Sequence, residues 1–146
     1  DDVDTVRRGL ADGTIDAITT DHAPHALEDK EAEWQTSAFG MLGLESALSV
    51  VVQAMVETGL LDWAGVADRM SIRPARIGRL GAQGQPISAG APANLVLVDP
   101  SARHIVDPST LVSKSRNTPY AGRELPVRVV HTFLRGTPTV VDGKSA

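Results

Sequence analysis

The stretch that decides the fold is "DGTIDAITTDHAPH", residues 12–25. Within it, residues 14–20 ("TIDAITT") are rich in β-branched side chains, which favour strands. The run ends at Asp21, and the loop after it holds His22 and His25, although the chain contains only 4 histidines. We therefore predict a strand whose carboxyl end carries an aspartate and a histidine-containing loop.

Helices are predicted on both sides of this strand. Residues 2–12 carry apolar side chains at helical spacing, with Asp2 as the N-cap and Gly13 placed to end the helix. After a long loop over residues 22–40, further helices are predicted over 44–57, over 62–70 and from Pro74 onward. Helices that alternate with a strand favour a parallel α/β arrangement.

The pattern changes after Leu80, where Gly and Pro become frequent. Four short runs beyond this point are typical of strands: "ANLVLVD", "HIVD", "VRVVHTFL" and "TPTVV". The last third of the chain is therefore predicted to form a small separate sheet.

The composition excludes several classes of protein. With 146 residues, 42% of them hydrophobic, the chain is long enough for one ordinary domain. Lys and Arg are scattered and number 14 against 18 Asp and Glu, so we expect no surface for nucleic acid. The longest apolar run, residues 48–52, is too short to cross a membrane. The absence of cysteine excludes disulfides and thiolate metal sites and suits a cytoplasmic protein.

The residues around Asp21 suggest chemistry. In a parallel α/β fold, catalytic groups gather at the carboxyl ends of the strands. A carboxylate at such an end can ligate a metal ion and take a proton from a metal-bound water. His25, held by the stiff Pro24, could contact an anionic substrate or a second metal ion. Asp21 followed by two histidines therefore indicates a hydrolytic metal site.

A plainer interpretation fits the same residues, with Asp21 capping a turn and both histidines lying on the surface of a loop. A zinc site needs three or four ligands. The remaining histidines, His104 and His131, fall in the strand-rich tail, where a satisfied or exposed histidine is the simpler expectation. We therefore expect that this chain does not assemble a complete metal site by itself.

Five motifs carry a resemblance to a known family. They are "DGTIDAITTDHAPH", "FGMLGLESAL", "RPARIGRLG", "GAPANLVLVDP" and "SKSRNTPYAG". Their order and spacing resemble the carboxyl-terminal third of bacterial dihydroorotases, zinc enzymes of the amidohydrolase superfamily, over nearly the whole chain.

The resemblance implies the carboxyl-terminal part of a (β/α)8 barrel plus part of a flanking small β-sandwich. Residues 1–58 would hold the last strand and helices of the barrel, 59–80 connecting helices, and 81–146 the carboxyl part of the sandwich. Such enzymes interconvert N-carbamoyl-L-aspartate and L-dihydroorotate in pyrimidine biosynthesis, with one or two zinc ions. The other metal ligands would lie in an amino-terminal part of the same enzyme, so this chain alone would be inactive.

The resemblance also assigns residues. Asp21 matches the catalytic aspartate that ligates zinc and shuttles the proton. His25 matches the histidine that binds the substrate's carboxylate, and Phe39 and Gly40 match a pair whose backbone touches the substrate. His22 matches a position that is not a metal ligand, and a hydrogen bond within the loop is expected for it.

Two alternatives stay open. One is a sibling cyclic amidohydrolase, such as an allantoinase or a hydantoinase. The other is a catalytically silent dihydroorotase-like chain that acts as a structural partner of aspartate transcarbamoylase. A homodimer is compatible with each of these possibilities. The charged residues 28–33 are expected to be a solvated loop face, and Trp34 and Trp63 are expected to pack rather than to bind ligands.

Overall fold

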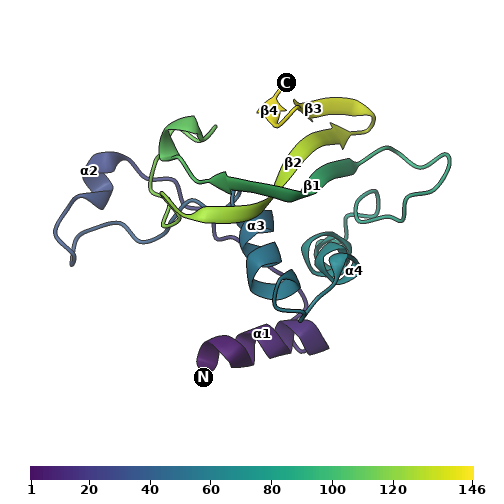
Figure 1. Cartoon of the computed structure of the whole chain (residues 1–146), viewed down its shortest axis with the longest axis horizontal. Coiled ribbons are helices and arrows are strands. Elements are labelled where there is room, and N and C mark those ends of the chain that lie inside the picture. The colour runs from purple at the N-terminus through teal and green to yellow at the C-terminus, as the bar shows by residue number, and fades with distance from the viewer.

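The computed structural model describes residues 1–146 and shows a group of short helices beside one antiparallel sheet (Figure 1). The helices are α1 (Asp2–Asp12), α2 (Leu27–Lys30), α3 (Ala47–Val51), α4 (Trp63–Ala67) and α5 (Arg73–Ile77). Two π-helical turns, η1 (Val52–Val56) and η2 (Asp68–Ile72), and one 3-10 turn, η3 (Pro108–Thr110), accompany them. The strands are β1 (Leu95–Ile105), β2 (Glu124–Leu134), β3 (Thr137–Val141) and β4 (Lys144–Ser145), in that order across the sheet.

Helix α1 confirms the first predicted helix, with one correction at its start. The N-cap is Asp1 rather than Asp2, because the Asp1 carboxylate accepts the N–H of Asp4 at 3.0 Å. Gly13 ends the helix in the left-handed conformation, at φ 93°, as its position predicted. Leu10 on this helix enters the small hydrophobic core.

The core lies where α1 meets the helices that follow the long loop. Its buried members are Leu10, Val51, Met55 and Val66. Arg69 is only 5% exposed and donates from Nε to the carbonyl of Leu10 at 2.8 Å. Burial removes the water that would hydrate the Arg69 guanidinium. The carbonyl acceptor and the neighbouring carboxylate of Asp68 compensate for this loss. The end of α1 is thereby fixed to η2.

The predicted strand over residues 14–20 is wrong, because no strand of this chain lies beside it. β-branched residues fit an extended backbone, but a strand exists only with a hydrogen-bonded neighbour. The segment is held instead by helices, since Ile18 N–H donates to the carbonyl of Arg69 at 3.1 Å. The parallel arrangement expected for this half is reduced to one bridge, between His22 and Met41.

The helix predicted over 44–57 begins later and is not uniform. Regular α-helix starts at Ala47 in α3, and η1 continues it with π-type bonds, such as Glu57 N–H to Val52 O at 3.0 Å. The helices expected over 62–70 and from Pro74 form one run through α4, η2 and α5. Asp62 caps this run by accepting the N–H of Gly65 at 2.7 Å.

The strand-rich tail forms one sheet, as predicted. Parts of the runs "ANLVLVD" and "HIVD" fall in the single strand β1, which pairs antiparallel with β2 and is interrupted by irregular register after Leu97 and Asp99. β2 turns into β3 through Arg135 and Gly136, both with positive φ. The architecture is thus helices plus one antiparallel sheet, while the barrel and the sandwich stay predictions.

The helical part meets the sheet at the buried residue Val127. Helix α3 packs against β2, and the Ser49 hydroxyl donates to the carbonyl of Val127 at 3.3 Å. Val127 is fully buried and has φ 57°, which is rare for a β-branched residue. The register between β1 and β2 shifts at this point, because Pro100, Ser101 and Ala102 of β1 lie opposite Val127 alone.

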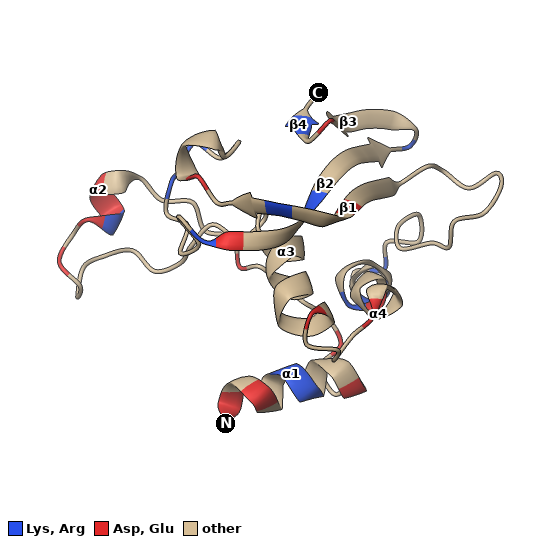
Figure 2. Ribbon diagram, viewed as in Figure 1, with Lys and Arg blue, Asp and Glu red and all other residues tan.

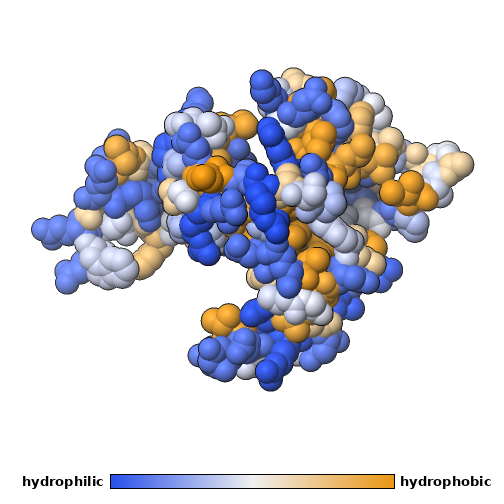
Figure 3. Space-filling view, in the orientation of Figure 1, coloured by the Kyte–Doolittle hydropathy of each residue, from blue (hydrophilic) through white to orange (hydrophobic).

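Much apolar surface stays uncovered. Only 14 of the 146 residues are buried, and apolar side chains reach the surface in several places (Figure 3). Trp34 is 90% exposed, so the expectation that it packs is wrong, and Trp63 is 40% exposed. Acidic and basic residues are interspersed along α1 and around α4 (Figure 2). None of the helices combines the length and the apolar character that crossing a bilayer requires.

Candidate active site

Asp21 lies at the end of the segment that α5 and η2 hold in place. The guanidinium of Arg73 binds the carboxylates of Asp16 at 2.7 Å and Asp68 at 2.8 Å. The hydrogen bond to Asp16 is the main reason why the pKa of Arg73 lies above its ordinary value. Asp21 itself has φ 44°, a left-handed conformation that aspartate tolerates better than most residues, and it is exposed. The chain therefore turns sharply at the candidate catalytic residue.

His22 fastens this turn to the chain beyond the long loop. Its Nδ1 accepts the N–H of Gly43 at 3.1 Å and that of Leu44 at 3.3 Å. Because a backbone N–H can only donate, Nδ1 carries no proton in this arrangement. The hydrogen bond of His22 was expected within the loop, and it forms instead with residues 43 and 44 beyond the loop.

His25 and Gly40 lie against each other, although 15 positions separate them in the sequence. Gly40 has φ 104°, and a Cβ placed on it would lie 3.6 Å from His25 Nε2 and only 2.5 Å from the Cβ of Ala23. His25 Nε2 is buried and has no hydrogen-bond partner. Phe39 points outward, with 91% of its surface exposed, so the two members of the predicted pair differ in setting.

Lys30, on α2, holds the end of the loop in shape. Its ammonium donates to the carbonyls of Ala38 at 2.6 Å and Gly40 at 3.1 Å. The Ser37 hydroxyl donates in turn to the carbonyl of Lys30 at 3.1 Å. The charged residues 28–33 are therefore not uniformly solvated, because the one lysine among them is committed to backbone acceptors.

Sequence reasoning did not assign a role to Asn117, which lies in the motif "SKSRNTPYAG". Its side chain donates from Nδ2 to the carbonyl of Ala23 at 2.9 Å and accepts the N–H of His25 at 3.4 Å. Nδ2 also approaches the carbonyl of Gly40 at 3.4 Å, and the Asn117 carbonyl accepts the N–H of Leu42 at 3.1 Å. The motif itself was the available signal, but nothing in it indicates contacts more than 90 residues away.

A cavity of about 430 Å³ opens beside these residues. His25 and Asn117 line it together with Lys30, Lys114 and Arg116, and no carboxylate does. The cavity is positive in a chain whose formal charge is −4, which suits an anionic ligand.

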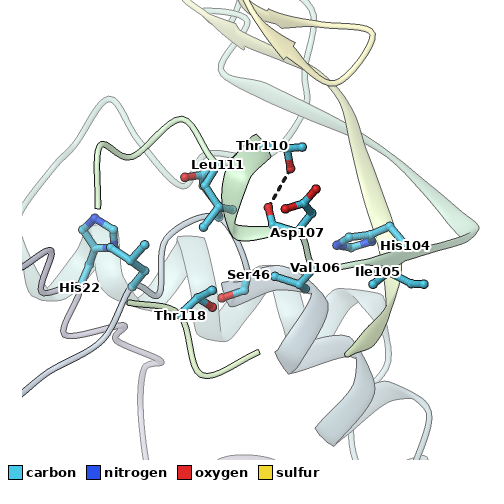
Figure 4. A pocket seen from close by; sticks show the side chains of 11 residues that line it. His22, Ser46, His104, Ile105, Val106, Asp107, Thr110, Leu111 and Thr118 are labelled. Carbon is cyan, nitrogen blue, oxygen red and sulfur yellow. Dashed lines mark hydrogen bonds between the residues drawn. The ribbon is translucent and has the colours of Figure 1, made fainter. Parts of the chain in front are cut away.

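A second, smaller cavity of about 80 Å³ lies on the other side of His22 (Figure 4). His22 and His104 stand at opposite ends of it, with Asp107 and Thr110 between them. Nδ1 of His104 is buried and has no partner, so this histidine is not satisfied as expected. Hydrogen bonds from the Ser109 hydroxyl and N–H hold the pKa of Asp107 below its ordinary value.

The residues present do not by themselves fit a zinc centre. No group of three or more His, Cys, Asp or Glu side chains gathers in a way that could hold a metal ion. His131 lies far along the sheet, where its Nε2 is 3.8 Å from the carboxylate of Asp142. Asp21 is therefore a single candidate ligand, whereas a zinc ion takes three or four.

The sequence of the chain is similar to a known protein family and to several named enzymes. The sequence pattern of the Amidohydrolase family matches residues 1–139. A dihydroorotase of Streptomyces coelicolor is 64% identical over 143 residues, which make up 98% of this chain and 33% of that protein. Dihydroorotases of Leifsonia xyli and Mycobacterium tuberculosis are 54% and 51% identical over the same shares. The chain thus spans about a third of the length of the curated relatives it matches.

The chain also resembles several solved structures, and again it matches about a third of their length. A D-hydantoinase (dihydropyrimidinase) from Thermus sp. superposes with a TM-score of 0.87 at 26% identity, over 98% of this chain and 32% of that one. An L-hydantoinase (dihydropyrimidinase) from Arthrobacter aurescens gives 0.87 at 29% identity, over 97% and 32%. Because the family pattern covers nearly all of its residues, the chain belongs to the amidohydrolase family.

Proposed function

We propose that the chain forms part of a dihydroorotase, a zinc-dependent cyclic amide hydrolase that interconverts N-carbamoyl-L-aspartate and L-dihydroorotate in de novo pyrimidine biosynthesis. The observation that carries this proposal is the 64% identity with a dihydroorotase over 98% of the chain. The two hydantoinases share only 26% and 29% of their residues with it.

Asp21 is the proposed catalytic residue. It is exposed, so its carboxylate can reach the attacking water, take a proton from it and return the proton to the leaving ring nitrogen. Bound zinc would polarise the amide carbonyl and make water more acidic. Asp21 would be one ligand of one or two zinc ions, whose other ligands come from an amino-terminal part of the enzyme.

His25, Phe39 and Gly40 are the proposed substrate-binding residues. Nε2 of His25 has no hydrogen-bond partner in the chain, and His25 lines the positive cavity, so we assign it to the carboxylate of the substrate. The proposed contact of Phe39 and Gly40 is through their backbone, and Lys30 holds the carbonyl of Gly40 at 3.1 Å. The domain division is part of the proposal, with barrel residues over 1–58, connecting helices over 59–80 and sandwich residues over 81–146.

The test is to assay the whole purified enzyme with L-dihydroorotate, hydantoin and allantoin in parallel. Turnover of L-dihydroorotate alone, lost on zinc removal, supports the proposal. Preference for hydantoin would favour the sibling activity, which the shared fold of the hydantoinases supports. An inactive protein that co-purifies with aspartate transcarbamoylase would indicate the silent partner instead, and size-exclusion chromatography would reveal a homodimer.

A further inference from the structure

We infer that Asn117 is a positioning residue that sets the place of His25 in the candidate active site. This inference rests on the proposed function, because His25 is the residue through which Asn117 would act. Asn117 is 92 residues from His25 in the sequence, and its carboxamide is the only side chain that bonds on both sides of Pro24.

The first step is that Asn117 bonds to the backbone on both sides of Pro24. Nδ2 of Asn117 donates to the carbonyl of Ala23 at 2.9 Å, and Oδ1 accepts the N–H of His25 at 3.4 Å. Proline offers no N–H of its own, so the turn cannot be closed by a backbone donor at that position. One planar amide therefore takes the place of the backbone bond and fixes both ends of the turn.

The second step is the orientation of the carboxamide. Nδ2 faces two carbonyl oxygens, of Ala23 and of Gly40, and a carbonyl can only accept. Oδ1 faces a backbone N–H, which can only donate. The two ends of the side chain are thus not interchangeable, and a carboxylate would place an oxygen against the Ala23 carbonyl.

The third step is that Asn117 holds the facing segment as well. Its carbonyl accepts the N–H of Leu42 at 3.1 Å, and Nδ2 lies 3.4 Å from the carbonyl of Gly40. His25 and Gly40 meet within this frame. Without the carboxamide, no side chain would bond on both sides of Pro24 to hold the turn that carries His25. The contacts around Asp21 would remain.

The experiment uses the whole enzyme and two variants of Asn117, with a matched control. Asn117→Ala removes the donor and the acceptor, and Asn117→Asp keeps the acceptor for His25 while replacing the donor. Asn94 supplies the control because it bridges two segments in the same way, donating to Ala82 O at 3.1 Å and accepting Arg135 N–H at 2.8 Å, outside the candidate site. Asn94→Ala therefore removes the same chemistry elsewhere.

We expect both Asn117 variants to lose roughly 10- to 100-fold in kcat/KM for L-dihydroorotate, because small displacements of a binding group cost this much. KM should carry more of the loss than kcat, and zinc content should match that of the unaltered enzyme. Hydrogen exchange at the His25 amide should accelerate in Asn117→Ala and not in Asn94→Ala.

Three outcomes would overturn the inference. Asn117→Ala could keep the kinetics of Asn94→Ala, or the His25 amide could exchange at an unchanged rate. All Asn117 variants could also lose zinc and cooperative unfolding together, which would make the residue structural. If the unaltered enzyme does not turn over L-dihydroorotate, the proposed function fails separately, and the exchange measurement still decides on the position of His25.

Discussion

Replacing Gly40 with alanine tests whether the close approach of the two ends of the long loop sets the activity. A Cβ on Gly40 would lie 2.5 Å from the Cβ of Ala23, whereas ordinary van der Waals contact begins at 3.4 Å. The two ends of the loop must therefore separate by roughly 1 Å, which is enough to cost up to about 100-fold in rate when the displaced groups position the substrate. The left-handed backbone, at φ 104°, adds strain on the order of 1–3 kcal/mol.

Gly90 separates these two effects. It also has positive φ, 87°, but an added Cβ would meet nothing within 4 Å. Gly90→Ala should therefore cost about 1 kcal/mol of stability through backbone strain and leave kcat/KM nearly unchanged. Gly40→Ala should cost more stability and also lose roughly 10- to 100-fold in kcat/KM.

The assay combines steady-state kinetics on L-dihydroorotate with urea unfolding of the whole enzyme. Urea unfolding measures the backbone strain that both variants share. Steady-state kinetics measures the effect of moving Ala23 and the nearby His25. If Gly40→Ala stays within about twofold of Gly90→Ala in kcat/KM, the contact between the two ends of the loop does not set the activity. The role given to the backbone at Gly40 would then be wrong.

Three further predictions concern ionisable side chains. Asp21→Asn should lower turnover by about two to four orders of magnitude with the fold intact, since an amide cannot carry the proton, and more than about a tenth of the activity left would contradict this. His25→Ala should keep the zinc content and weaken substrate binding by a few tens-fold, or about 2 kcal/mol; loss of zinc on elemental analysis would make His25 a metal ligand instead. The lowered pKa of Asp107 stabilises the fold above the carboxyl's unfolded pKa, and this contribution disappears as pH falls through the lower folded value. Ser109→Ala should therefore raise the pKa of Asp107 toward 3.8, lower the stability near neutral pH and reduce the part of it that is lost in acid. NMR titration and unfolding at several pH values, against the unaltered protein, would measure both effects.

Local patterns predicted the elements that depend on local physics. The apolar spacing of α1 and the glycine that ends it suffice to place that helix, because capping and periodicity act within a few residues. The short strands of the tail were found for the same reason. By contrast, residues 14–20 have strand-like composition and no partner strand, and composition carries no information about a neighbour.

The sequence motifs predicted part of the candidate site. Asp21, His25 and Gly40 were named from their motifs, and the structure brings His25 and Gly40 together while Asp21 stands apart at a turn. The roles stay predictions. Asn117 escaped because its bonds join residues more than 90 positions apart, and no periodic pattern records such a contact.

The distance between Asn117 and the loop it holds has a consequence for protein synthesis. Residues 21–42 leave the ribosome about 75 residues before Asn117 does, which at 5–20 residues per second is a delay of roughly 4–15 s. During that interval the nascent loop lacks the four hydrogen bonds to Asn117, at Ala23, His25, Gly40 and Leu42. A chain that terminates early, anywhere before residue 117, would therefore carry Asp21 and His25 and still leave the turn around Pro24 unclosed.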